Sequence, residues 1–178
     1  CSKRHDYEEK VFFNGNFTNN FRQEFFGKSN SSIFDDLVKN GQQPQILMVA
    51  CSDSRVDPAI ITNAEPGELF TVRNVANIIP PYEETPGQHG TSAAVEFAVL
   101  NLGVKHVVIL GHSNCGGIRS LFEESPTQNH GANFISNWMQ MAHNCRNKVN
   151  HMHPDKSSAD KAEICAQYSL LNSKNNLL

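Results

Sequence analysis

The sequence lacks the features of a membrane protein or a nucleic-acid-binding protein. No hydrophobic run approaches the ~20 residues that cross a bilayer, and a formal net charge of −3 provides no basic field to gather nucleic acid or anionic lipid. No signal peptide is recognisable. We therefore expect no nucleic-acid partner, no membrane partner and a cytoplasmic location. Export or organelle targeting stays open, because the chain begins at Cys1 rather than at Met.

Cysteine is scarce and odd in number. The 178 residues contain five cysteines, and an odd count in a chain of this size disfavours a disulfide framework. Two explanations then remain for each cysteine: it binds a metal, or it is simply buried in the core. Cys145 and Cys165 lie in segments with a helical pattern, and we expect both to be buried there as small apolar side chains.

Three short apolar runs alternate with helical patterns along the chain. The runs read "QILMVAC", "ELFTVRNVAN" and "HVVILGH", and their lengths suit buried strands. The alternation predicts an α/β fold with a parallel sheet core, in a Rossmann-like order, flanked by helices. Residues 1–178 are interpreted as a single domain in which residues 1–40 form an N-terminal helical arm, ended by Asn40-Gly41.

Two segments are more apolar than surface helices usually are. Residues 91–102 are apolar on nearly every side, so both faces of that helix should be covered. In the N-terminal arm, phenylalanine recurs every fourth residue, at Phe13, Phe17, Phe21 and Phe25. Monomeric proteins rarely leave so much apolar surface exposed to water, so the pattern predicts at least a dimer, with the arm packed on the partner.

Two of the predicted strands end in residues that can bind a metal. The first run ends in Cys51-Ser-Asp53, and the third continues into His112-Ser-Asn-Cys115. Ligands of open parallel sheets bind at the carboxyl ends of the strands. Two thiolates, an imidazole and an oxygen position make a tetrahedral zinc set. The combination predicts one zinc site.

Arg55 decides between two kinds of zinc site. A closed, structural site is one possibility, but such sites usually take their ligands in pairs from knuckles. Arg55 can form a bidentate pair with Asp53 and so compete with the metal for that carboxylate. If Asp53 turns to Arg55, the fourth zinc position opens, which is the mark of a catalytic zinc.

Four segments together resemble the β-class carbonic anhydrases. They are "CSDSRVDP", "EPGELFTVRNVANIIPP", "HGTSAAVEFAV" and "VVILGHSNCGGI". The resemblance extends from about Gln42 to Ile118, and a fainter likeness continues to the end of the chain, closest to the plant-type branch.

The resemblance implies an enzyme, a lyase of the carbonate dehydratase type. It implies zinc held by Cys51, His112 and Cys115, and reversible hydration of CO2 to bicarbonate and a proton by zinc-bound hydroxide. Asp53 and Arg55 would form the catalytic dyad, with Asp53 a zinc ligand only in a closed state of the site.

The resemblance also implies a substrate pocket. Gln42 would hold an oxygen of the substrate or of bicarbonate, Phe70 and Val75 would be apolar pocket residues, and Gly116 would offer a backbone N–H near the zinc. Phe97 stands where the plant-type branch usually has tyrosine. In that branch the pocket is completed across a subunit interface, so the partners would be CO2 or bicarbonate and further copies of the chain, as a homodimer or tetramer.

The sequence departs from the family in two other places. Met48 replaces the tryptophan of the bicarbonate-regulated branch, which predicts an open site at neutral pH without cooperative inhibition by bicarbonate. Because the chain stops at Leu178, we expect the C-terminal strand and helix of the family to be missing from it.

Three other functions compete with CO2 hydration. A carbonyl sulfide or carbon disulfide hydrolase on the same scaffold would use the same ligands. A non-catalytic zinc-binding or redox-sensing protein would have no use for the Asp53–Arg55 pair. A nucleotide-binding module would need "GHSNCGG" as a phosphate loop, but the chain has neither G-x-G-x-x-G nor a Walker lysine.

Overall fold

The computed structural model describes residues 31–84, 87–123 and 133–178, in two compact units, 1–42 and 43–178. The described part of the first unit is helix α2, Ser31–Asn40, and Gly41 follows it with a left-handed φ of 75°. The chain therefore leaves this helix at the predicted Asn40-Gly41. The phenylalanine stripe lies outside the described residues. The boundary between the units falls two residues after the predicted arm, and the single-domain assignment stays a prediction.

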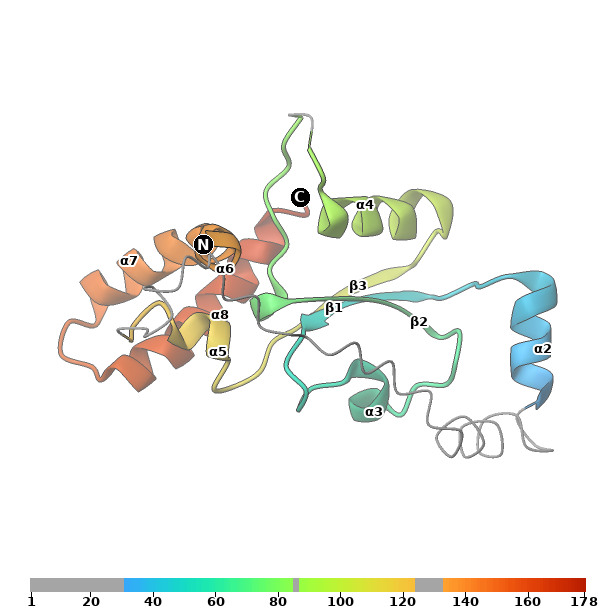
Figure 1. Cartoon of the computed structure of the whole chain (residues 1–178), viewed down its shortest axis with the longest axis horizontal. Helices are drawn as coiled ribbons and strands as arrows, with labels where there is room; N and C mark the ends of the chain where they lie inside the picture. Colours follow the sequence, from blue (N-terminus) through green and yellow to red (C-terminus); the bar gives the residue numbers. More distant parts are fainter. Residues whose placement is uncertain (1–30, 85–86, 124–132) are drawn as a thin grey trace, which may run out of the picture. The chain divides into compact units, whose positions relative to one another are not determined.

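The second unit is built on a parallel three-stranded sheet (Figure 1). Strands β1 (Ile46–Cys51), β2 (Leu69–Asn74) and β3 (His106–Leu110) occupy the three predicted apolar runs. Their order is β2-β1-β3, so β1 lies in the middle and is buried along nearly its whole length. The predicted α/β class with a parallel sheet is confirmed.

The register brings the two predicted ligand segments together. Cys51 is paired with Asn74 of β2, and Ala50 is paired with Leu110 of β3. Parallel strands end at the same edge of a sheet. The residues that follow β3 therefore emerge beside the residues that follow β1.

Helices occupy the segments between and after the strands. Helix α3 begins where expected, because the Asp57 carboxylate accepts hydrogen bonds from the N–H groups of Ala59 and Ile60, with Pro58 in the first turn. The strands point toward helices α5 to α8 (Figure 1). The helices after α2 are α3 (Pro58–Thr62), η1 (Val75–Asn77), α4 (Gly90–Glu96), the π-helical η2 (Phe97–Asn101), α5 (Gly116–Arg119), α6 (Asn133–Met139), η4 (Gln140–Ala142), α7 (His143–Met152) and α8 (Ser158–Asn175).

The core of the second unit has two parts. One lies between the sheet and α4 and contains Leu47, Val49, Ile79 and Ala98. The larger part joins the strand ends to α5 through α8, and its buried members include Cys51 and Cys115. Cys145 and Cys165 belong to the same cluster, as predicted, and burial raises the pKa of Cys165 to about 12.

The apolar helix at residues 91–102 is covered on one side within a single chain. Ala98 is fully buried against the sheet, whereas the side chain of Leu100 is 74% exposed, and Phe97 and Val99 are also exposed. Exposure continues onto β3, at Val107 and Val108. The expectation that both faces are covered therefore does not hold for one chain.

None of the helices in the described part of the chain is both long enough and apolar enough to cross a membrane.

Candidate metal centre

Three ligand side chains converge where β1 and β3 end. Cys51 is the last residue of β1, and His112 and Cys115 lie in the loop between β3 and α5. Their ligand atoms all lie within 4.8 Å of one another, and the two Sγ atoms are 4.0 Å apart. One ion at the centre of this triangle would be in reach of all three atoms.

The imidazole of His112 is oriented as a metal ligand. Its Nδ1 lies 2.9 Å from the carbonyl oxygen of Ser113, which fixes the proton on Nδ1 because a carbonyl can only accept. The lone pair is then on Nε2. That atom is buried and has no hydrogen-bond partner in the described part of the chain. A buried nitrogen left unpaired is costly, and a metal ion would satisfy it.

The two thiols are equally shielded from solvent. Cys51 and Cys115 are each 4% exposed. Burial is the main reason why the pKa of Cys115 is raised, and the neighbouring Cys51 adds to it. The Cys115 sulfur therefore needs a nearby positive charge to become a thiolate, which zinc would supply on binding. The donor set fits zinc by both composition and geometry.

Asp53 faces Arg55 in a bidentate pair. Arg55 donates from Nε to Oδ1 at 2.9 Å and from Nη2 to Oδ2 at 2.7 Å, and its backbone N–H reaches Oδ1 at 3.0 Å. These bonds hold the pKa of the Asp53 carboxyl well below its usual range. Oδ2 lies 3.9 Å from Nε2 of His112. The Asp53 carboxylate thus lies at the edge of the triangle formed by Cys51, His112 and Cys115, while its charge is paired with the guanidinium of Arg55.

Arg73 holds the backbone that carries Cys51 and Asp53. Its guanidinium donates to the carbonyl of Cys51 at 3.0 Å, to the carbonyl of Asp53 at 2.7 Å and to the carboxylate of Asp57 at 2.9 Å. From the sequence, Arg73 matched only the residue set of the bicarbonate-regulated branch, and no part in holding the site was predicted for it. Its place as the one charged residue of β2 was the signal that could have marked it.

The predicted pocket residues have different positions. The rings of Phe70 and Phe97 lie 5.9 Å apart, at the layer between the sheet and α4. Val75 follows β2, and its carbonyl accepts a 2.7 Å hydrogen bond from Trp138, another residue that the sequence interpretation missed. Trp138 is the chain's one tryptophan, which was the available signal.

Gly116 opens α5 directly after Cys115, so its backbone lies beside a predicted ligand. Gln42 belongs to the first compact unit. The roles of all the pocket residues stay predictions.

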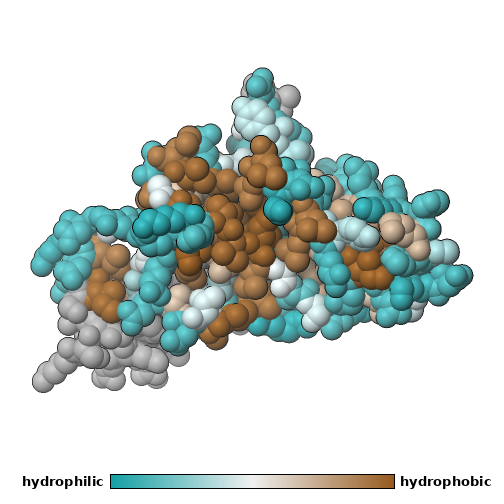
Figure 2. Space-filling view, turned by 180° about the vertical axis from the view of Figure 1, so that it is seen from behind, coloured by the Kyte–Doolittle hydropathy of each residue, from teal (hydrophilic) through white to brown (hydrophobic). Residues whose placement is uncertain are grey.

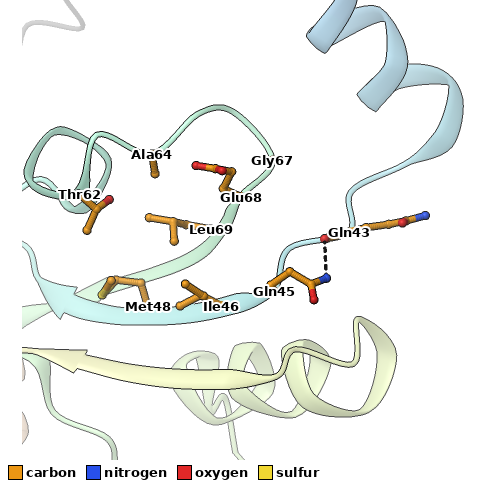
Figure 3. A pocket seen from close by; sticks show the side chains of 9 residues that line it. All are labelled: Gln43, Gln45, Ile46, Met48, Thr62, Ala64, Gly67, Glu68 and Leu69. Atoms are coloured by element: carbon orange, nitrogen blue, oxygen red, sulfur yellow. Dashed lines mark hydrogen bonds between the residues drawn. The ribbon is translucent and has the colours of Figure 1, made fainter.

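Met48 lines a separate cavity of about 380 Å³ with Ile46 and Leu69 (Figure 3). Met48 and Cys51 point to opposite faces of β1, because side chains alternate along a strand. Glu68 is the one charged residue among those lining the cavity. An anion would therefore meet an acid here and find no basic side chain.

The family model described as carbonic anhydrase matches residues 46–178. The chain belongs to the β-class carbonic anhydrase family. It is 36% identical over 162 residues to Beta carbonic anhydrase 3 of Arabidopsis thaliana, covering 90% of this chain and 60% of that protein. It is 35% identical over 157 residues to a carbonic anhydrase of Synechococcus elongatus, covering 88% and 56%.

Solved β-carbonic anhydrases share the fold. The structure of the β-carbonic anhydrase CcaA superposes with a TM-score of 0.79 at 33% identity, over 90% of this chain and 70% of that one. A tetrameric β-carbonic anhydrase of Sordaria macrospora gives a TM-score of 0.76 at 29% identity, over 92% and 78%. This β-carbonic anhydrase chain spans about 60% of the length of the curated relatives named above.

Proposed function

We propose that this protein catalyses the reversible hydration of CO2 to bicarbonate and a proton with a single zinc ion held by Cys51, His112 and Cys115. The observation that carries the proposal is the buried Nε2 of His112, unpaired in the described part of the chain, beside two buried sulfurs. A zinc ion in such a site lowers the pKa of a coordinated water to about 7, which supplies a nucleophile near neutral pH.

The chain's own residues orient that nucleophile. An ionised carboxylate has about four acceptor positions. At Asp53, Arg55 occupies two on Oδ1 and one on Oδ2. The remaining position is on Oδ2, the oxygen nearest to His112 Nε2. Since Asp53 stays ionised, it can only accept there, and it would align an attacking water by taking a hydrogen bond from it.

The substrate needs apolar surroundings more than charged ones. CO2 carries no net charge, and the Phe70–Phe97 pair offers aromatic surface in the layer between the sheet and α4, with Phe70 near the amino end of β2. Phe97 contributes no hydroxyl, so this part of the pocket would bind the substrate by contact alone. Gln42 would supply the polar contact to an oxygen of the substrate.

A second copy of the chain would complete the functional unit. Leu100, Val99 and Val107 line a groove of about 750 Å³. With the exposed Phe97 they form what we call the outer apolar face, seen as the hydrophobic area over α4, η2 and β3 in Figure 2. Such a face favours association, and the Sordaria macrospora relative is described as tetrameric.

The proposal is tested on the full chain by two measurements on one sample. Zinc content is measured by mass spectrometry of the metal, and CO2 hydration is followed by stopped flow with a pH indicator. We expect about one zinc per chain and hydration that a chelator abolishes. A zinc-loaded protein that hydrolyses carbonyl sulfide and leaves CO2 unhydrated would refute the assignment.

A further inference from the structure

Asn114 has an unusual backbone in the middle of the ligand loop. It lies between His112 and Cys115 and adopts a left-handed φ of 53°. Residues other than glycine adopt this conformation at a cost, although asparagine tolerates it better than most. This conformation turns the chain so that His112, two residues before Asn114, and Cys115, one residue after it, point toward each other's ligand atoms. A loop of this kind needs contacts that hold it.

The backbone of Asn114 is held on both sides by residues from other parts of the chain. Its N–H donates to Oε1 of Glu163 at 2.6 Å. Its carbonyl oxygen accepts from Nη2 of Arg55 at 3.1 Å. The first bond comes from α8, 49 residues later, and the second from the residue that pairs with Asp53.

Helix α8 is anchored in the core on both sides of Glu163. Ala162, which precedes Glu163, is 3% exposed, and Cys165, two residues after Glu163, is 0% exposed. Both belong to the core cluster that also contains Cys51 and Cys115. The helix therefore has little freedom to shift relative to the ligands. A bond from a backbone N–H to a carboxylate is also stronger than one to a neutral acceptor.

We propose that Glu163 is a positioning residue that keeps the His112–Cys115 loop in its ligating shape. The inference rests on the proposed zinc site and adds a residue to it that touches neither the metal nor the substrate. Without Glu163, Asn114 could relax to a right-handed conformation, and Nε2 of His112 and Sγ of Cys115 would no longer converge. Zinc affinity would fall even though all three ligands remain.

The test compares three variants of the full chain: Glu163→Ala, Glu163→Gln and Gln167→Ala. The glutamine keeps an acceptor oxygen at the same reach. Gln167 is an exposed residue of the same helix and serves as the control. Zinc affinity is measured by competition with a chromophoric chelator, and thermal unfolding of the zinc-free protein is recorded beside it. Lost support of a metal ligand typically costs 10- to 100-fold in affinity, and we expect about that for Glu163→Ala. Glu163→Gln should lose clearly less, because its amide oxygen is a weaker but still present acceptor, and Gln167→Ala should stay close to the parent.

Two results would overturn the inference. One is unchanged zinc affinity in Glu163→Ala despite a lower unfolding temperature, since that describes a merely structural contact. The other is an equal loss in Glu163→Gln and Glu163→Ala, since the hydrogen bond would then not matter. If Glu163→Ala does not fold, Glu163→Asp replaces it, because the shorter side chain keeps the charge and cannot reach Asn114.

CO2 hydration by the parent chain is recorded separately. A parent that binds zinc tightly and leaves CO2 unhydrated would refute the proposed reaction, while the affinity series would still decide the role of Glu163. A parent that binds no zinc would refute both.

Discussion

Arg55 and Asp53 lie two residues apart and form a bidentate ion pair, with Nε 2.9 Å from Oδ1 and Nη2 2.7 Å from Oδ2. The same Nη2 also donates to the carbonyl of Asn114, in the loop that carries His112 and Cys115. One guanidinium thus connects the segment after β1 with the segment after β3. It therefore holds the Asp53 carboxylate at the edge of the Cys51–His112–Cys115 group and contacts the backbone of the opposite loop.

Replacing Arg55 should separate metal binding from turnover. Arg55→Ala should keep most of its zinc, because the three proposed ligands remain and Glu163 still holds the backbone of Asn114, and lose about 100-fold in kcat/KM, because the carboxylate is no longer aimed. Arg55→Lys should recover little, because an ammonium cannot form the bidentate pair. Zinc analysis and stopped-flow hydration on the same samples check both statements. Turnover close to the parent in Arg55→Ala would show that the pair is not needed.

Replacing a ligand should remove the metal itself. Cys115→Ser should lose most of its zinc, because a hydroxyl is a much poorer zinc ligand than a thiolate. Cys145→Ser is the matched control, since Cys145 is also buried in the same cluster and lies outside the ligand triangle. Metal content after dialysis against a mild chelator distinguishes the two. Full zinc occupancy in Cys115→Ser would contradict the ligand assignment.

A charge on the outer apolar face should dissociate the oligomer. Leu100→Lys places an ammonium at a side chain that is 74% exposed in one chain and would be buried against a second copy. We expect the mass from light scattering at micromolar concentration to fall to that of one chain. Ile60→Lys is the control, because Ile60 is 81% exposed on α3, outside this face. A parent protein that is already monomeric and fully active would refute the association.

Bicarbonate should not inhibit cooperatively. The cavity beside Met48 is lined by apolar and neutral polar residues and by Glu68, so it contains no cation to bind an anion. Without an anion bound in this cavity, nothing there favours a closed state in which Asp53 leaves Arg55 and binds the zinc. The Asp53–Arg55 pair should therefore persist at neutral pH and leave the fourth zinc position open. Hydration rates across a bicarbonate series should follow simple product inhibition. A sigmoidal loss of activity, or an Asp53 oxygen within about 2.2 Å of zinc in a structure near pH 7.5, would refute this prediction.

The sequence by itself determined the class of fold and the convergence of the ligand triangle. The strands follow from local composition, because apolar runs of this length favour strands, although three of the five residues of β3 are exposed in one chain. Parallel strands also end at one edge, so residues after β1 and after β3 were expected at that edge, and the order β2-β1-β3 makes them neighbours. Cys51, His112 and Cys115 could therefore be brought together before any coordinates were known.

The tertiary structure decided how the site is held. The contacts of Arg73 with Cys51, of Trp138 with Val75 and of Glu163 with Asn114 join residues 22, 63 and 49 positions apart. No local pattern encodes them, because each depends on how one element packs on another and on a single side-chain conformation. The uncovered side of residues 91–102 was decided in the same way. Composition shows that a helix is apolar all round, but only packing shows which face the chain itself can bury.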